Sequence, residues 1–268
     1  MENFNYNKVY YKVINKEGIY KGYKYSDGLN RAPKDFCDAF KNIFNHKGFW
    51  FTDYEHLPKF FENGIYIHEV IIPKTNIQRD LITQQYFTQK IILKNKYHIT
   101  NDFDKWFDPN RFNWALSSYL AKYCYSVFDK WWDAEKYNWI FADYLARYCY
   151  KHFDKWWNAE KYNWEFSDHL VLFCANHFDK WWDAEKFNWD QSYYLTKYFH
   201  NHFVKWWDPK KFNWEQSDCL AEYCSEHFEK WWDAERFNWE FADYLAKYCS
   251  NYIYKWWNKE KFNKKIKG

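Results

Sequence analysis

Hydrophobic and polar positions in the second half of the chain repeat every 25 residues. The phrase Phe-Asp-Lys-Trp-Trp and its variants place a Trp at each 25-residue step from Trp106 to Trp256, and a second Trp follows directly in every copy except the first, where Phe107 stands. A second phrase, Phe/Tyr-Asn-Trp, recurs with the same period from Trp114 to Trp239. A fixed period of this length predicts stacked copies of one supersecondary unit.

Each unit is predicted to be helical. In residues 208–232 the apolar side chains follow spacings of three and four, without strict alternation. Asp208-Pro209 is typical of a helix N-cap followed by Pro at the first helical position, and Asn176–Asp179 resembles a capping box. These signals predict a longer helix at about 209–224 and a shorter one at about 227–232. Antiparallel long helices with a true period of about 50 residues are the alternative.

The chain is therefore expected to contain a small α+β domain, residues 1–100, followed by an all-α repeat array, residues 101–268. The array is predicted to be an α-solenoid of about six units, because one unit cannot bury its aromatic side chains alone. The units are 108–132, 133–157, 158–182, 183–207, 208–232 and 233–257, with a partial polar and basic cap at 258–268.

The N-terminal segment has a different pattern, with short apolar runs between turn residues. Strands are predicted at 9–14, 48–52, 65–73 and 90–93, and helices at 36–44 and 56–62. Asn63-Gly64 is a good C-cap for the second of these helices.

Composition narrows the function. Aromatic residues make up 27% of the chain, so it should fold despite 28% charged residues. The repeat half holds 24 Lys/Arg and 26 Asp/Glu. This near-neutral balance disfavours nucleic-acid binding, although Lys130-Trp131-Trp132 and its copies could stack bases along a single strand. The acidic neighbours of each Lys are interpreted as i, i+4 partners.

No transmembrane or signal segment is predicted, and no membrane partner is expected. A cytoplasmic location is expected. Seven Cys residues, five of them at one repeat position, are interpreted as small buried residues without disulfides. Cys149 with His152 and Cys174 with His177 have zinc-like spacing, but the pattern fails at Phe199. Neither a metal nor a cofactor is expected.

The tandem Trp residues supply the candidate binding residues. Consecutive residues of a helix point about 100° apart, so one Trp of each pair is predicted to be half exposed; the alternative buries both. Exposed Trp is frequent at binding hot spots. The predicted binding residues are Trp132, Trp157, Trp182, Trp207, Trp232 and Trp257.

A resemblance follows from three N-terminal strings: Gly28–Asn30, Gly48–Asp53 and His56–Pro73. Together they resemble an uncharacterised domain at the start of many repeat proteins of giant DNA viruses of the mimivirus type. Those proteins often continue into ankyrin-like or other repeats, and the Trp-rich units also look like repeat proteins of such viruses. The resemblance covers about residues 8–100 and implies a viral, intracellular origin, with no established activity.

The predicted function is a non-enzymatic protein-interaction or scaffold protein that binds an unidentified protein through its repeats. One alternative is enzymatic: Gly48–Thr52 is similar to a strand phrase of mono-ADP-ribosyltransferases, with Glu69 as the acid and His56, His68 and Tyr10 in the pocket. The competing interpretation is that Trp50 and Phe51 alternate between core and surface. The second alternative is single-stranded nucleic-acid binding by the repeats.

Overall fold

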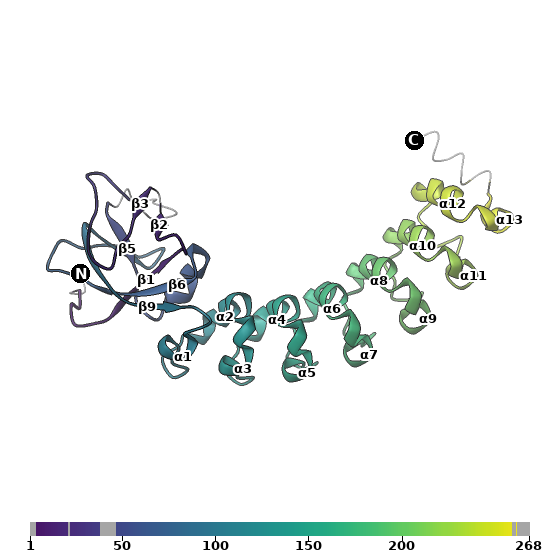
Figure 1. Cartoon of the computed structure of the whole chain (residues 1–268). Coiled ribbons are helices and arrows are strands. Elements are labelled where there is room, and N and C mark those ends of the chain that lie inside the picture. The colour runs from purple at the N-terminus through teal and green to yellow at the C-terminus, as the bar shows by residue number, and fades with distance from the viewer. Residues whose placement is uncertain (1–3, 21, 38–46, 259–260, 262–268) are drawn as a thin grey trace. The chain divides into compact units, whose positions relative to one another are not determined.

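The computed structural model describes residues 4–20, 22–37, 47–258 and 261. The chain forms two compact units, Met1–Tyr144 and Leu145–Gly268. Within the described residues, strands occur as far as His98 and α-helices from Phe103 onward, which confirms the predicted fold class of a strand-containing domain followed by a helical repeat array (Figure 1). The first unit holds the strands together with the first repeats, and the domain boundary at residue 100 remains a prediction.

The strand-rich region is built from antiparallel pairs. One sheet has the order β1-β6-β9-β4, with β1 (Tyr10–Ile14), β6 (Tyr66–Ile71), β9 (Lys90–His98) and β4 (Gly28–Arg31). A second has the order β5-β8-β7, with β5 (Phe49–Phe51), β8 (Gln85–Thr88) and β7 (Gln78–Asp80). The strands β2 (Ile19–Tyr20) and β3 (Tyr23–Lys24) form a short hairpin.

The core of this region lies where β5 meets β1, β6 and β9. Phe49 and Phe51 are fully buried and cluster with Tyr10, Val70 and Ile91. The four predicted strands are therefore confirmed, since their apolar side chains are the ones that fill this core. The other strands were not predicted, because they are only two to four residues long and carry mostly polar or half-exposed side chains.

The predicted helix at 56–62 is a 3₁₀ helix, η1 (Leu57–Asn63). Gly64 is its C-cap, as predicted, and donates its N–H to the Phe61 carbonyl, but its φ of 166° is extended backbone and not the left-handed conformation usual for a C-cap glycine. Glycine is required there for a different reason: a Cβ on Gly64 would lie 2.2 Å from the carbonyl carbon and oxygen of Ile14. The predicted helix at 36–44 lies mostly outside the described residues.

Each repeat contains two unequal α-helices, which confirms the two-helix unit and makes the 50-residue alternative wrong. The longer helices are α2 (Ser117–Tyr123), α4 (Ala142–Tyr148), α6 (Ser167–Phe173), α8 (Ser192–Tyr198), α10 (Ser217–Tyr223) and α12 (Ala242–Tyr248). The shorter ones are α1 (Phe103–Trp106), α3 (Phe128–Trp131), α5 (Phe153–Trp156), α7 (Phe178–Trp181), α9 (Phe203–Trp206), α11 (Phe228–Trp231) and α13 (Ile253–Trp256). A three-residue 3₁₀ turn precedes every helix from α2 onward.

The helix starts differ from prediction. The Asp208 carboxylate accepts from the Lys210 N–H over 2.9 Å, which makes a turn and not a helix N-cap. Helical structure begins at η10 (Trp214–Gln216), where the Asn213 side chain accepts from the Glu215 N–H over 3.1 Å. The predicted capping box is also wrong, since α7 has no side-chain cap bond.

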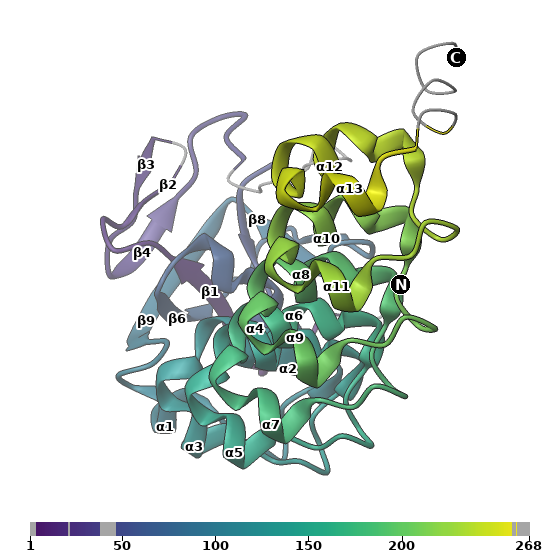
Figure 2. The same ribbon diagram turned by 90° about the vertical axis from the view of Figure 1, so that its right-hand side faces the viewer.

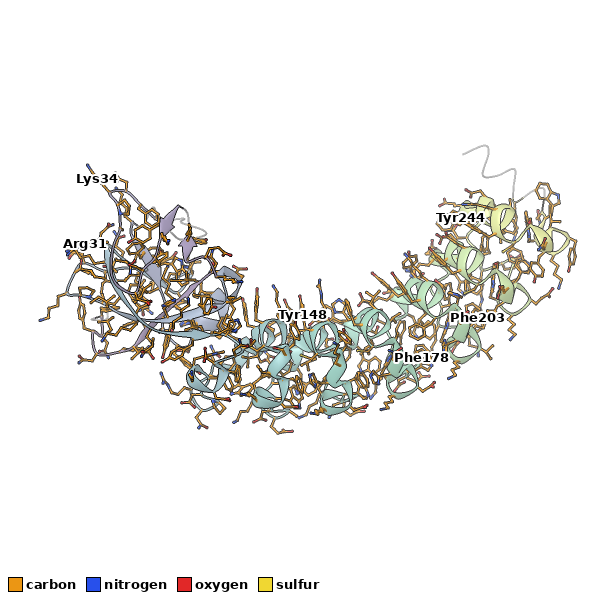
Figure 3. All side chains as sticks on the ribbon, in the orientation of Figure 1. Arg31, Lys34, Tyr148, Phe178, Phe203 and Tyr244 are labelled. Atoms are coloured by element: carbon orange, nitrogen blue, oxygen red, sulfur yellow. The ribbon has the colours of Figure 1, made fainter. Side chains whose placement is uncertain are left out.

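The longer helices of the second unit lie side by side in sequence order. In Leu145–Gly268, α6 contacts α8, α8 contacts α10, and α10 contacts α12, while α7, α9, α11 and α13 form a second row (Figures 1 and 2). The buried stripe of α6 continues into the next residue and is spaced by three and four, at Ser167, Leu170, Val171 and Cys174. Phe178 and Phe203 lie inside this array, and Tyr244 lies at its edge on α12 (Figure 3).

Candidate functional site

The first series of Trp residues ends the shorter helices and is buried. It comprises Trp106, Trp131, Trp156, Trp181, Trp206, Trp231 and Trp256, each at most 6% exposed. Each indole N–H donates to the backbone carbonyl seven residues earlier over 2.8–2.9 Å. From Trp131 onward, that carbonyl belongs to the residue that follows the longer helix. The first series therefore links the two helices of each repeat. Loss of one of these bonds would leave a buried carbonyl without a donor, which is costly.

The second series is the second Trp of each tandem pair: Trp132, Trp157, Trp182, Trp207, Trp232 and Trp257. In all but the last, the ring stacks on the Phe four residues earlier, as Trp207 does on Phe203 at 5.1 Å and 21°. The first five are half-buried and Trp257 is exposed. Among the described residues the indole N–H of those five has no hydrogen-bond partner. None of these nitrogens is a buried atom, so each is open to solvent.

The third series is the Trp of the Phe/Tyr-Asn-Trp phrase: Trp114, Trp139, Trp164, Trp189, Trp214 and Trp239. These rings are half-buried, and each indole N–H donates to the carbonyl five residues earlier, as Trp139 does to Ala134 over 2.9 Å. A cation from the following repeat lies over some of these rings, with Arg236 5.9 Å from the ring centre of Trp214. The third series therefore uses its polar atom inside the array, and the second series does not.

Neighbouring repeats are joined by stacked rings. The Phe that begins α5, α7, α9 and α11 lies against a ring of the next repeat. Phe153 stacks on His177 at 4.3 Å and 7°, and Phe203 stacks on His227 at 4.6 Å and 19°. His177 and His227 thus belong to the joints between repeats.

Exposed ion pairs also join the repeats. They differ from the i, i+4 pairs that the sequence predicted for these lysines. Lys205 pairs with Asp179 of the preceding repeat over 2.6 Å. The same arrangement, 26 residues apart, joins Lys130 to Asp104, Lys180 to Asp154 and Lys255 to Glu229. The predicted i, i+4 pairing is wrong, because these lysines reach across to another repeat. Val204 stands 26 residues before Lys230, where most other repeats have Asp or Glu. Lys230 therefore has no ion-pair partner among the described residues.

A tyrosine-rich face on the longer helices was missed by the sequence analysis. On α8 and α10, the ring centres of Tyr193 and Tyr223 lie 6.3 Å apart, and the Lys197 ammonium donates to the Tyr193 hydroxyl over 3.0 Å. Burial and the Tyr193 hydroxyl raise the pKa of Tyr223 to about 12. The buried side chains of α10, Ser217, Leu220 and Ala221, share one face of the helix, so Tyr223 lies outside that face, toward solvent. This pattern in the sequence could have predicted the tyrosine-rich face.

None of the seven cysteines forms a disulfide. The five at the shared repeat position are buried, as predicted. Sγ of Cys174 donates to the Ala146 carbonyl over 3.8 Å, and Sγ of Cys224 donates to that of Thr196 over 3.9 Å. Burial raises the pKa of each of these two thiols to about 12. In the described part of the chain, no cluster of three or more His, Cys, Asp or Glu side chains could hold a metal ion.

The three residues of the enzymatic alternative, His56, His68 and Glu69, each contact different partners. Nδ1 of His56 lies 2.7 Å from the Asp53 carboxylate. His68 and Glu69 are neighbours on β6 and so point to opposite faces of the sheet. Glu69 accepts from the Tyr97 hydroxyl and the Asn95 amide over 3.1 and 2.7 Å. No hydrogen bond or ion pair between described residues joins His56, His68 and Glu69.

His68 instead lies in a cross-strand row of basic side chains. Its register partners are Lys12 on β1 and Lys96 on β9. Lys12 is buried, donates to the Trp50 carbonyl over 2.9 Å, and lies 4.0 Å from the centre of the Trp50 ring. Burial, and then the charges of Lys96 and Lys12, lower the pKa of His68 to about 4. His68 is therefore a neutral, buried side chain at pH 7.

These features define a repeat protein in which a strand-rich region precedes an array of paired short helices with a 25-residue period. The chain is 31% identical over 122 residues to a protein of Acanthamoeba polyphaga mimivirus described as a putative ankyrin repeat protein. That match covers 40% of this chain and 60% of the relative, so the chain spans less than two thirds of it. An uncharacterized protein of the same virus is 28% identical over 109 residues, 37% of this chain and 73% of that protein.

The resemblance to mimivirus-type repeat proteins is thereby confirmed. No family model and no solved structure matches the chain. No helix among the described residues is long and apolar enough to cross a membrane.

Proposed function

We propose that this chain is a non-enzymatic protein-interaction or scaffold protein whose repeats form an α-solenoid and bind a protein partner. The contact residues are the second series of Trp residues. A relative described as a putative ankyrin repeat protein supports a role built on repeats. The place of action is the host cytoplasm or the virion of a mimivirus-type virus.

One observation carries this proposal. Every repeat has three Trp residues, two of which donate their N–H to a carbonyl of the array, whereas the N–H of the second series is open to solvent in Trp132, Trp157, Trp182, Trp207 and Trp232. A half-buried Trp with a free donor offers a rigid apolar surface and one directed hydrogen bond. Such residues are enriched among binding hot spots. The matching partner presents carbonyl oxygens, one for each repeat that it contacts.

The pairing of the lysines supports a protein partner over a nucleic acid. Lys180 and Lys205, which precede tandem Trp pairs, are already bound to acidic residues of the preceding repeat. A phosphate backbone would have to displace those carboxylates, and it would find few uncompensated cations. Single-stranded nucleic acid is therefore the competing partner, and the experiment must be able to detect it.

The test uses the full-length chain and a matched pair of triple variants. Proteins and nucleic acids captured by the immobilised chain from virus-infected cells are quantified by mass spectrometry and sequencing. Replacing Trp182, Trp207 and Trp232 by Phe removes three free indole donors, and we expect at least about a tenfold loss of the specific protein partner. Replacing Trp189, Trp214 and Trp239 by Phe removes three internally bonded donors and should leave capture unchanged.

Circular dichroism shows whether each triple variant remains folded. Equal capture by the two folded variants and the wild type would refute the role of the second series. Nucleic acid as the dominant captured species would refute a protein partner.

A further inference from the structure

The strand-rich region contains a small cavity with a mostly polar surface. It has a volume of about 220 Å³ and is bordered by β1, β6 and β9 and by the loops that precede β2 and β4. Its inner wall includes the buried His68, and its rim carries four exposed charged side chains: Lys16, Glu17, Asp27 and Lys96. Sites for drug-sized ligands usually exceed about 300 Å³, so this cavity suits a smaller molecule.

The two loops of the rim are held in place by hydrogen bonds. The Tyr25 N–H donates to the Gly18 carbonyl over 2.8 Å, which joins one loop to the other. The Asn15 side chain donates to the Ile19 carbonyl over 2.7 Å and accepts from the Ile19 N–H over 3.1 Å. The shape of the cavity is therefore fixed by the fold, as is usual for sites that bind small molecules.

The inner wall offers a polar group that lacks a partner. His68 is only 6% exposed, and its Nδ1 is a buried atom with no hydrogen-bond partner among the described residues. Such an atom is costly unless something bonds to it, so a ligand in the cavity would supply the missing bond. Burial lowers the pKa of His68, the charge of Lys96 lowers it further, and the charge of Asp27 raises it. Both charged side chains therefore lie near the imidazole.

The rim presents charges of both signs that are not used inside the protein. None of its two lysines and two acidic residues forms an ion pair with a described residue, whereas Lys180 and Lys205 of the array do. The Lys96 ammonium lies 3.9 Å from the centre of the Tyr66 ring. An anion in the cavity would meet two carboxylates, and a cation would meet two ammonium groups. A small molecule that carries both charges finds a partner for each of them.

We propose that this cavity binds a small zwitterion, an α-amino acid with a short side chain. Lys16 and Lys96 hold the carboxylate of the ligand. Glu17 and Asp27 hold its ammonium group, and the imidazole of His68 forms a hydrogen bond with it from the inner wall. The site shares no residue with the Trp series of the array, so it does not depend on the proposed protein-interaction function.

The test titrates each of the standard α-amino acids into the full-length chain by calorimetry and follows the histidine ring resonances by NMR. We expect a short amino acid to bind and to shift the His68 resonances, which the spectrum of His68→Gln assigns. The His56 resonances should stay unchanged, because His56 contacts Asp53 and does not line the cavity. The N-acetylated and the amidated forms of the same amino acid each lack one charge and should bind at least about tenfold more weakly.

Variants of the rim keep this test independent of folding. Lys96→Met and Asp27→Asn alter exposed side chains, and each should weaken binding at least about tenfold. Lys94→Met is the matched control for Lys96→Met, because Lys94 is an exposed lysine of the same strand that does not line the cavity. It should bind the amino acid as the wild type does.

Several outcomes would overturn the inference. If no amino acid binds, or if a bound amino acid leaves the His68 resonances unchanged, the cavity is not an amino-acid site. If inorganic phosphate binds as tightly as the amino acid and Asp27→Asn does not weaken either ligand, the cavity is an anion site. Equal losses in Lys94→Met and Lys96→Met would assign the effect to the general charge of β9 and not to the cavity.

Discussion

The strand-rich region and the repeat array are stabilised by contacts of different range. In the strand-rich region, β1 pairs with β6 and β9 pairs with β4, so strands that are distant in sequence must meet before the core closes. In the array, the first Trp series reaches back seven residues, and the ion pairs join residues 26 apart. A change in the strand-rich region should therefore weaken it as a whole, whereas a change in the array should act on one repeat and its neighbours.

The largest effect is expected for Gly64→Ala in the strand-rich region. Its Cβ would lie 2.2 Å from the Ile14 carbonyl, and both partners are backbone that cannot rotate away. We expect a loss of at least about 3 kcal/mol in the free energy of unfolding, measured by hydrogen exchange of the β1 and β6 amides. Gly22→Ala is the control for steric overlap, because no atom lies within 4 Å of its added Cβ and its cost is limited to the strain of an alanine at a φ of 78°. Unchanged protection in Gly64→Ala would show that the two segments do not meet this closely.

The array offers a matched pair at adjacent positions. Trp206→Phe removes a buried N–H and leaves the Phe199 carbonyl without its donor, at a cost of about 2 kcal/mol. Trp207→Phe removes an N–H that is open to solvent and should cost less than about 0.5 kcal/mol. Chemical denaturation monitored by far-ultraviolet circular dichroism compares the two variants. Similar losses would contradict the division of the tandem pair into a structural and a free Trp.

Acid should weaken the strand-rich region through His68. Its folded pKa of about 4 lies below its usual 6.5, so the unfolded chain binds the proton more readily and stability is lost as pH falls from about 6.5 toward 4. We expect about 2 kcal/mol of loss between pH 7 and pH 5, at roughly 1.4 kcal/mol per pKa unit. Hydrogen exchange of the β6 amides measures this slope, and His68→Gln should remove it. A slope that persists in His68→Gln would assign the pH dependence to another group.

The smallest effect is expected for Val204→Asp. The new carboxylate would complete the series of exposed ion pairs by meeting Lys230, as Asp179 meets Lys205. Exposed pairs contribute little, so the gain in Tm should stay below about 2 °C. It should vanish in 0.5 M salt, and Val204→Asn should not produce it. A salt-independent gain would show that removing an exposed apolar side chain, and not the ion pair, stabilises the array.

The sequence predicted the fold best where apolar side chains were dense. The 25-residue period and the strands around Phe49 and Val70 followed from spacing alone, because their apolar residues fill the cores. The two helices per unit were predicted from capping signals, and those caps lie elsewhere in the structure. The short strands β4 and β7 were missed, because nothing in their composition separates them from loops. The strand β8 has strand-forming residues in Tyr86, Phe87 and Thr88, but it is only four residues long and was missed as well. The helix start was predicted at Asp208 but lies at Asn213. Both residues are good caps, and only the backbone shows which one precedes helical structure.

The candidate site was predicted only in part. The tandem pair was expected to split into one buried and one half-exposed Trp, and the structure shows this split at Trp206 and Trp207. The hydrogen bond from the Trp214 N–H to the Pro209 carbonyl could not be predicted from the sequence, because a turn places that carbonyl. The tyrosine-rich face of α8 and α10 was not predicted, because Tyr223 follows the same spacing of three and four as the buried apolar side chains.

The sequence by itself determined the repeat, its helical character and the residues that must be buried, because a helix sets which of its own side chains share a face. The tertiary structure decided which partner each polar group meets. It turned Lys205 toward Asp179 of another repeat, required Gly64 for a close approach to Ile14, and stacked Phe203 on His227 of the next repeat. These outcomes depend on how one repeat or strand is placed against the next, and residue spacing along a single element contains no information about that placement.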